Sequence, residues 1–441
     1  MITRERIGTI FKLAYPITIA LSSSLIMALI DIAMVGTLGD NAIAAVGLAS
    51  FSYTLVTALV AGIAPAVQGL VARRRGEGSS EPGCLPLNAG LLLAVLVGIP
   101  LTLVCYALTP GFFSLISSDS EVTRIGVPYL RTLYLAVAMV GLNNAFEGYW
   151  TAVERPKVYM VVVIVMNCLN ILINYVLIFG HFGAPALGAR GAAIGTASAI
   201  CVGVIINFVM AGLHLRRDGF LRAKPESPLL ARVLQMGIPA TMQEFFYSAG
   251  YIVFFWMIGQ VGTTDLAAAN VLVRVTMMLV LLAMALGMTS ATLVSKTVGE
   301  GDLAGAAQWG WDTAKVGVIG ITLLGLPLLL FPQFFLSLFL NDPHTIQVAT
   351  IPMRLVAATT GAGSLIYIFS YTLYSVGDGN RVIMISFSTQ WLFFLPAVWI
   401  VGPHLNYGLL QIWLVQIAYG AIATALITTI WINGRWKTVK V

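Results

Sequence analysis

Long runs of hydrophobic residues alternate along the chain with short stretches of polar, glycine and proline residues. Most runs reach or exceed the roughly 20 residues that a helix needs to cross the hydrocarbon core of a bilayer. Turn signals such as Arg155-Pro156 and the stretch Gly377 to Asn380 separate the runs. The pattern predicts an all-α integral membrane protein with twelve transmembrane helices, over residues 8–35, 44–72, 87–117, 124–151, 158–180, 188–214, 231–258, 267–297, 310–338, 347–374, 382–402 and 408–434.

The composition agrees with this fold class. Of 441 residues, 59% are hydrophobic and only 10% are charged, whereas soluble domains carry about 25% charged residues. The four cysteines are scattered, without the spacing of a disulfide framework or a metal site. Neither a nucleotide-binding loop nor a nucleophile motif is present. We therefore expect no enzyme activity, no metal and no cofactor, and we expect any active transport to use an ion gradient.

The basic residues indicate the orientation of the chain, because cytoplasmic loops carry an excess of Lys and Arg. With both termini in the cytoplasm, all but five of the 24 Lys and Arg residues fall on the inner side. The five exceptions are Arg124, Arg131, Arg190, Arg274 and Arg354. We expect a multi-pass protein of the cell inner membrane that contacts the lipid bilayer, and we attribute the net charge of +6 to its loops rather than to nucleic-acid binding.

The two halves of the chain resemble each other at one constant offset. The shift that places Pro16 on Pro239 also places Gly76-Glu77-Gly78 on Gly299-Glu300-Gly301, and we call it the repeat shift. We expect two pseudo-symmetric lobes of six helices each, residues 1–215 and 231–441, joined by a cytoplasmic linker over residues 216–230. Duplicated halves with a binding site between them are typical of secondary transporters.

Asp31 interrupts the apolar run of residues 25–35 in the first predicted helix. A charged Asp at the centre of a membrane helix costs about 2.5–3.5 kcal/mol on insertion scales, so such residues usually face a cavity or a partner. A buried carboxyl group also retains a proton more readily, which suits a proton carrier. Our interpretation is ion or proton coupling; the alternative is a polar contact that only holds helices together.

Several polar residues are candidate partners of Asp31. In the fifth predicted helix, Asn167, Asn170 and Asn174 follow an i, i+3, i+7 spacing and share one face. The first, fourth and sixth helices add Ser24, Asn143, Asn144 and Thr196. In lipid such side chains should turn toward protein or water. The alternative for any one of them is an ordinary interhelical hydrogen bond.

The repeat bears on these alternatives. Under the repeat shift, Asp31 corresponds to Phe254, Asn170 to Phe393 and Asn174 to Ala397. A purely architectural requirement would place polar residues in both lobes, so the asymmetry favours a function. Elsewhere Glu244 in the seventh helix is a second candidate for titration or cation binding, and Glu147 and Asp378 are weaker ones.

The ordered motifs resemble the multidrug and toxic compound extrusion (MATE) family over essentially the whole chain. The resemblance lies in Ala14-Tyr15-Pro16, in Asp31 to Gly39, in Ala44 to Leu48, in Gly188 to Thr196 and in Gly377-Asp378. The resemblance implies the export of small-molecule drugs or toxic organic cations in exchange for H+ or Na+. Within it, Asp31 matches the first-helix acid of the DinF-like branch.

The same resemblance implies roles for other residues. Asn170 and Asn174 match polar positions of the fifth helix, and Thr196 matches a hydroxyl of the sixth helix. Asn174 replaces an Asp that several relatives carry, which leaves one carboxyl group and favours H+. Glu244 and Asp378 match loosely the acids that sodium-coupled relatives use.

The sequence thus supports a monomeric, proton-coupled antiporter that alternates between outward-open and inward-open states. Sodium coupling on the same fold is the first alternative. A lipid-linked precursor flippase is the second, although the ionisable residues expected at mid-membrane, Asp31 and Glu244, are acidic rather than basic. A membrane enzyme is the third, and no catalytic constellation favours it.

Overall fold

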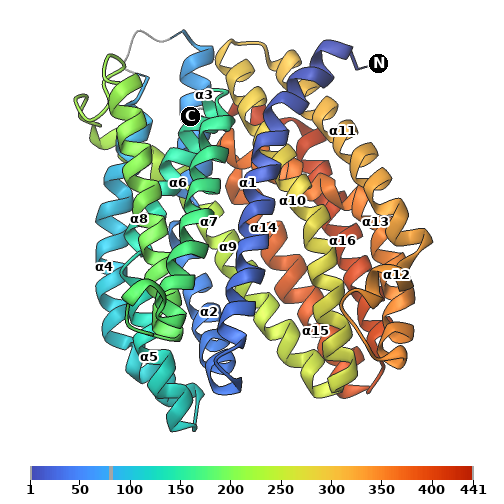
Figure 1. Cartoon of the computed structure of the whole chain (residues 1–441). Helices are drawn as coiled ribbons and strands as arrows, with labels where there is room; N and C mark the ends of the chain where they lie inside the picture. Colours follow the sequence, from blue (N-terminus) through green and yellow to red (C-terminus); the bar gives the residue numbers. More distant parts are fainter. Residues whose placement is uncertain (1, 79–82, 440–441) are drawn as a thin grey trace. The chain divides into compact units, whose positions relative to one another are not determined.

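The computed structural model describes residues 2–78 and 83–439, and almost all of them are helical (Figure 1). The chain forms two compact units. We call Ile19–Thr241 the N unit, and Met1–Thr18 together with Met242–Val441 the C unit. The chain passes from one unit to the other inside two helices, after Thr18 and again after Thr241, and the repeat shift places the first of these positions on the second.

Eight α-helices precede residue 215: α1 (Arg4–Gly36), α2 (Asp40–Ala61), α3 (Ile63–Gly76), α4 (Leu85–Ile116), α5 (Ser120–Tyr134), α6 (Val137–Ala152), α7 (Pro156–Phe179) and α8 (Ala189–His214). The rest of the chain forms α9 (Ser227–Val261), α10 (Thr263–Gly299), α11 (Leu303–Leu330), α12 (Pro332–Ser337), α13 (Pro343–Ser375), α14 (Gly379–Phe387), α15 (Leu395–Trp399) and α16 (Leu409–Asn433). Within the C unit, α13 packs along α10 and α11.

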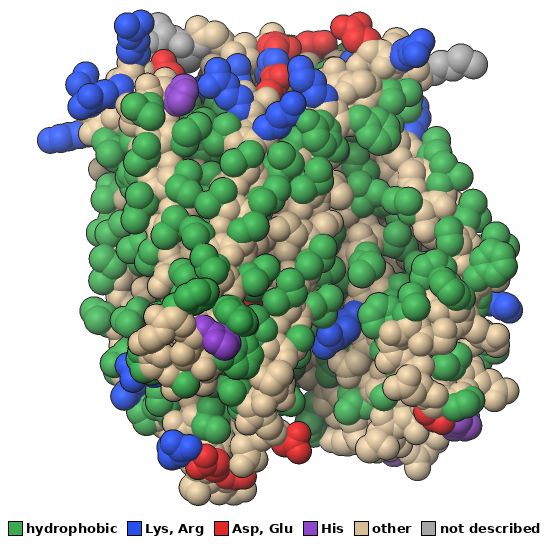
Figure 2. Space-filling view, in the orientation of Figure 1, with side chains coloured by type: hydrophobic (Ala, Val, Ile, Leu, Met, Phe, Trp, Pro, Cys, Tyr) green, Lys and Arg blue, Asp and Glu red, His purple; other side chains and the backbone are tan. Residues whose placement is uncertain are grey.

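The helices account for the predicted membrane spans. Within the described residues, ten helices are long and apolar enough to cross a membrane, counting α2 with α3 as one and the run Gly379–His404 as another. The pair α5 and α6, bent by 43°, gives an eleventh. The 35-residue α9 is the remaining long helix and occupies the place of the predicted seventh span. In each unit the visible face is mainly hydrophobic at mid-height, and most Lys and Arg side chains gather toward one end (Figure 2).

Two predicted helices are interrupted in the structure. The second breaks at Gly62, where an added Cβ would overlap the carbonyl oxygen of Gly237 on α9. The absence of a side chain therefore permits a backbone-to-backbone contact within the N unit. The fourth bends at Leu135 and Ala136, neither of which is a helix-breaking residue.

The eleventh predicted helix contains two π-helical segments, residues 388–394 and 400–404. Such segments are rare and insert residues into the α-helical repeat. The first segment shifts the register of the residues after it, which matters for comparing the two units below.

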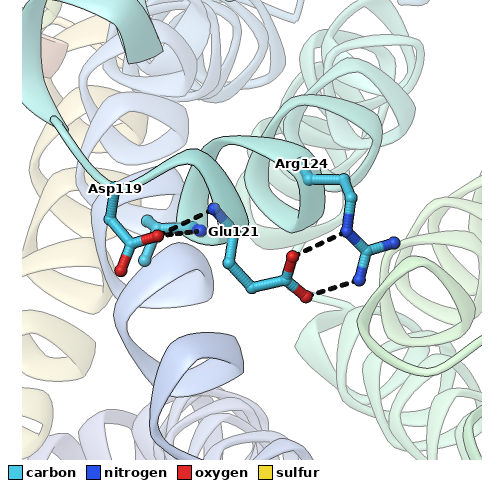
Figure 3. Close-up of polar contacts among 4 residues, drawn as sticks. Asp119, Glu121 and Arg124 are labelled. Atoms are coloured by element: carbon cyan, nitrogen blue, oxygen red, sulfur yellow. Dashed lines mark hydrogen bonds and ion pairs between the residues drawn. The ribbon is translucent and has the colours of Figure 1, made fainter.

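A side-chain cap fixes the beginning of α5. Asp119 Oδ1 accepts hydrogen bonds from the backbone N–H groups of Glu121 (2.7 Å) and Val122 (3.4 Å), which have no partner inside the helix (Figure 3). Glu121 in turn forms a two-pronged ion pair with Arg124, one turn further along. Both side chains are exposed, so the pair orders a loop end and adds little stability.

The segment before α9 is docked onto the N unit. Asn88 on α4 donates to the carbonyl oxygens of Gly219 (3.0 Å) and Ala223 (2.8 Å), and it accepts from the N–H of Leu221 (3.1 Å). Phe220 is buried against Phe146 and Phe208. The predicted linker therefore has a fixed conformation over these residues.

Candidate functional site

Four polar residues from three helices of the N unit form one continuous hydrogen-bonded chain. Asn174 Nδ2 on α7 donates to Asp31 Oδ1 on α1 (2.6 Å) and lies 2.9 Å from Asn170 Oδ1, one turn earlier on α7. Asn170 in turn lies 3.0 Å from Thr196 Oγ1 on α8. Asn170 and Asn174 are buried, whereas Asp31 is half-buried. The structure thus brings together Asp31, Asn170, Asn174 and Thr196.

The side-chain amide of Asn170 fits this hydrogen-bonded chain in two orientations. In one, its nitrogen donates to Thr196 Oγ1 and its oxygen accepts from Asn174. With its oxygen and nitrogen exchanged, the nitrogen donates to Asp31 Oδ1 (3.1 Å), and the oxygen accepts from the N–H (3.1 Å) and hydroxyl (3.0 Å) of Thr196. In either orientation one atom of the Asn170 amide lies 3.1 Å from Asp31 Oδ1 and the other lies 3.0 Å from Thr196 Oγ1, so the amide links Asp31 to Thr196.

Gly195 and Tyr129 also adjoin this hydrogen-bonded chain, and neither is among the site residues predicted from the sequence. Within the described part of the chain, the side-chain oxygen of Asn174 is buried without a hydrogen-bond partner, and a Cβ on Gly195 would overlap it. Only glycine leaves room for that oxygen. Tyr129 on α5 is near enough to interact electrostatically with Asp31. Neither residue carries a local sequence signal, because both roles depend on which helices pack together.

Asn167, the third residue of the stripe, pairs with a different partner. Its Nδ2 donates to Ser23 Oγ on α1 (2.7 Å), whereas Ser24 donates to the carbonyl oxygen of Ala20 in its own helix. Ser24 therefore makes no hydrogen bond to the chain of polar residues around Asp31. Under the repeat shift Asn167 corresponds to Gln390, whose Nε2 donates to the carbonyl oxygen of Tyr247 on α9 (3.2 Å).

The contact of Asn167 is thus repeated in the C unit, whereas the contacts of Asp31 are not. The C-unit counterpart of Asp31 is Phe254, which is 2% exposed and packs against Phe394. Phe394 stacks on Tyr419, the counterpart of Thr196. Phe394 is one position beyond the strict counterpart of Asn170, as expected at the end of the π-helical segment, which inserts an extra residue. Aromatic packing in one unit occupies the place of the polar chain in the other.

Asn143 belongs to a separate polar group. It donates to the carbonyl oxygen of Ile200 (3.2 Å) and accepts from Asn207 (3.1 Å), which also accepts from the indole N–H of Trp150 (2.9 Å). One turn beyond Asn143, the side chain of Glu147 is hydrogen-bonded to Tyr159. These contacts join α6, α7 and α8 and do not include Asp31.

The two acidic candidates of the C unit lie in different surroundings. Glu244 on α9 is half-buried and close enough to Tyr367 and Tyr374 for its charge to act on their hydroxyl groups. Asp378 precedes α14 and lies 3.4 Å from Arg381. Burial raises the pKa of the Asp378 carboxyl above its ordinary value, and Arg381 opposes that change. No contact between Glu244 and Asp378 is seen among the described residues.

A tight metal site is not evident in the parts of the chain that the structure describes. No three His, Cys, Asp or Glu side chains of residues 2–78 and 83–439 lie together as ligands. The chemistry available at Asp31 is therefore that of one carboxyl group surrounded by amides and hydroxyls, which can bind a proton or a weakly held cation.

A family model described as MatE matches the chain twice, over residues 16–176 and 239–400. The matches begin at Pro16 and Pro239 and together cover more than half of the chain. The repeat shift places the start of the first match on the start of the second, in agreement with the internal repeat.

Curated relatives match at low identity over nearly their full length. The chain is 23% identical over 440 residues to the probable multidrug resistance protein NorM of Thermotoga maritima, covering 97% of this chain and 92% of the relative. It is 26% identical over 438 residues to the protein of the same description in Rhodopseudomonas palustris (96% and 90% covered). It is 23% identical over 400 residues to the multidrug resistance protein MdtK of Yersinia pseudotuberculosis (89% and 87%).

Solved structures share the fold. A multidrug resistance MATE family transporter in an outward-facing conformation superposes with a TM-score of 0.86 at 18% identity, covering 97% of this chain and 94% of that one. A MATE transporter of Vibrio cholerae gives a TM-score of 0.88 at 17% identity, with 99% of both chains covered. The predicted fold of twelve helices in two repeated halves is confirmed.

Proposed function

This chain belongs to the MatE family of membrane transporters, a family of transporters rather than enzymes, and we propose that it exports cationic or amphipathic organic compounds in exchange for protons. Export proceeds by alternation between outward-open and inward-open states. The protein acts as a monomer in the cell inner membrane, with both termini in the cytoplasm. Its relatives described as multidrug resistance proteins support the substrate class.

The hydrogen-bonded chain around Asp31 carries this proposal. A carboxylate at membrane depth requires donors or a counter-charge. The hydrogen-bond partners of Asp31 are the neutral amides of Asn174 and, in its second orientation, Asn170. Protonation of Asp31 removes its charge and lets the carboxyl group donate a hydrogen bond as well as accept one. The site can therefore exist in two states that differ by one proton.

The two asparagine amides connect these states to helix contacts. While Asp31 is ionised, its carboxylate accepts a hydrogen bond from Asn174 on α7. Asn174 in turn contacts Asn170, and Asn170 contacts Thr196 on α8, so a change in the charge of Asp31 acts on contacts among α1, α7 and α8. A proton and a substrate that favour different states would then exchange across the membrane.

The asymmetry between the units supports a functional role for Asp31. A side-chain amide that bonds to a neighbouring helix is present at the same repeat position in both units, as Asn167 and Gln390. Where Asp31 lies in the N unit, Phe254 is buried in the C unit. The fold therefore does not need an acid at this position.

Sodium coupling is the second candidate, and Glu244 favours it. Glu244 has a carboxyl group in the C unit whose charge acts on Tyr367 and Tyr374, and carboxylate oxygens suit hard cations. Asp378 is the weaker member of this candidate, because Arg381 already lies beside it.

Dye transport in proteoliposomes tests the proposal. The wild type and Asp31→Asn are reconstituted at equal amounts with ethidium as a fluorescent organic cation, and a pH gradient is imposed in sodium-free buffer. We expect the wild type to move ethidium and Asp31→Asn to remain at the level of empty vesicles. Equal transport by both would contradict the role of Asp31. Transport by the wild type only under a sodium gradient would favour Glu244 instead.

A further inference from the structure

The beginning of α1 is bound to the C unit by an ion pair. Arg6 Nη1 lies 2.5 Å from Asp312 Oδ2 on α11, and the guanidinium carbon lies 4.2 Å from the centre of the Trp309 ring. The Asp312 side chain is 4% exposed and the Arg6 side chain 19%. A buried carboxylate that loses its counter-charge is strongly disfavoured, and Arg suits a site that combines pairing with stacking.

The same helix carries Asp31 in the other unit. Helix α1 is continuous from Arg4 to Gly36 and leaves the C unit after Thr18. Pro16, two residues before that point, lacks the backbone N–H that would bond within the helix. One end of α1 is thus held by Asp312, the other end carries the candidate ion site, and the helix is weakened between them.

Helix α9 shows the same arrangement with the units exchanged. It begins in the N unit and passes into the C unit after Thr241, two residues beyond Pro239. Its beginning is held by the contact of Gly237 with Gly62, and the preceding segment is held by Asn88. Each unit therefore holds the start of the helix that continues into the other.

The ion pair itself is not repeated. Under the repeat shift Arg6 corresponds to Leu229 and Asp312 to Ala89, both uncharged. The helix that carries Asp31 is held at its start by an ion pair, whereas α9, which carries Phe254 at the corresponding position, is not. Arg6 and Asp31, neither of which has a charged counterpart in the other repeat, thus lie on the same helix.

We propose that Arg6 and Asp312 are positioning residues for ion-coupled transport. They fix the beginning of α1 against α11, so that a displacement of α1 at Asp31 passes along the continuous helix to α11. Coupling requires a physical connection whose state both sites influence, and α1 provides one. This inference rests on the proposed function of Asp31 and adds the means of transmission.

Substitutions on both sides of the pair test it. Arg6→Ala and Asp312→Ala are compared with the exchanged pair Arg6→Asp with Asp312→Arg, and Arg4→Ala is the matched control because Arg4 is an exposed basic residue of the same turn. Each variant is measured for ethidium binding in detergent across pH and for ethidium turnover in proteoliposomes. Arg6→Lys keeps the charge but not the planar group, and it serves if the alanine variants do not fold.

We expect each alanine variant to lose about tenfold or more in turnover, equivalent to about 1.4 kcal/mol in the barrier. Ethidium affinity and its pH midpoint should remain those of the wild type, since Asp31 and its partners are intact. The exchanged pair should recover at least half of the lost turnover, and Arg4→Ala should lose none. Arg6→Lys should fall between the wild type and Arg6→Ala.

Wild-type turnover in the alanine variants would overturn the inference. So would a shifted pH midpoint of binding, because the pair would then act on the site itself, and so would failure of the folded exchanged pair to recover turnover. Asp31→Asn is measured in parallel, and if it retains proton-driven transport, the proposed function is wrong. The role of Arg6 and Asp312 is decided separately, by comparing ethidium turnover of their variants and the wild type under an ethidium gradient.

Discussion

Asn174 donates a hydrogen bond of 2.6 Å to Asp31 although 143 positions separate them in the chain. The bond joins α7 to α1 near the C-terminal end of α1, and it brings one of the most buried amides of the N unit to a carboxyl group. Because the oxygen of the same amide rests against Gly195, the position of Asn174 is fixed by packing as well as by its hydrogen bonds.

Replacement of Asn174 should impair coupling, whereas replacement of Asn167 should not. Asn174→Ala removes a donor from Asp31, and we expect proton-driven transport to fall by about tenfold or more, as for the loss of a hydrogen bond to a charged group worth about 1.5–3 kcal/mol. Asn167→Ala is the matched control on the same helix face. It removes the bond to Ser23, which has a counterpart in the C unit, and should lower thermal stability only. Equal transport losses in the two variants would contradict this distinction.

Gly195→Ala should act on the site without altering any of its polar groups. The new Cβ would overlap the Asn174 side-chain oxygen, so Asn174 or α8 must move, at a cost of about 1–3 kcal/mol. We expect lower stability and a loss of proton-driven transport. Gly212→Ala on the same helix meets no atom of the described chain within 4 Å and should stabilise the protein by about 0.5–1 kcal/mol. Thermal unfolding and ethidium transport of the pair check both expectations; wild-type behaviour of Gly195→Ala would refute the steric argument.

The hydrophobic runs and the repeat suffice to predict the helices and the two halves. The helical spacing of Asn170 and Asn174 also places them on one face, where the structure finds them. The details of helix contact are not predictable in this way. The spacing of Ser24 and Asp31 predicts that they lie together, but Ser24 bonds within its own helix and Ser23 meets α7 instead. A rotation of one residue, set by packing along the whole helix, decides between them.

Other features lack any local signal. The bend at Leu135 and Ala136 contains neither glycine nor proline, so the sequence predicts a straight fourth span. The roles of Gly195 and of the pair Arg6 and Asp312 depend on segments distant in the sequence. Composition and periodicity describe each helix alone, and these features belong to pairs of helices.

Asp378→Asn should make stability less sensitive to pH. Burial raises the pKa of Asp378 above its ordinary value of 3.8, with Arg381 opposing, so the folded protein binds this proton more tightly than the unfolded chain. Its contribution favours folding at low pH and is lost as the pH rises through the folded pKa. Asp378→Asn should therefore melt at a higher temperature than the wild type at pH 7.5, and the difference should vanish near pH 4. A variant that melts lower at pH 7.5 would show that the pair with Arg381 outweighs burial.

Asp342→Asn is a control of opposite sign. The hydroxyl and the backbone N–H of Thr345 donate to Asp342 and lower the pKa of its carboxyl group. Such a group stabilises the folded state above its ordinary pKa, and that contribution is lost as the pH falls through the folded value. We expect Asp342→Asn to melt below the wild type at pH 7.5 and to approach it in acid. Scans of intrinsic fluorescence from pH 4 to about 8 compare both variants with the wild type.

Asn88→Ala should release the segment that precedes α9. The change removes three hydrogen bonds to Gly219, Leu221 and Ala223, and we expect a loss of about 1–3 kcal/mol because buried backbone groups lose their partners. The segment contains exposed arginines at 216, 217 and 222, so limited trypsin digestion in detergent reports its release directly. Cleavage there should be faster in Asn88→Ala than in the wild type.

Leu221→Gly separates the loss of docking from a mere change of sequence in the same segment. Leu221 has a φ of 55°, a left-handed conformation that costs a branched side chain about 1–2 kcal/mol, and its side chain is 63% exposed. Glycine adopts this conformation without strain. We expect Leu221→Gly to resist trypsin at least as well as the wild type and to melt no lower. Because the N–H that bonds to Asn88 is retained, faster cleavage of Leu221→Gly would mean that the Leu221 side chain, and not the hydrogen bonds of Asn88, holds the segment in place.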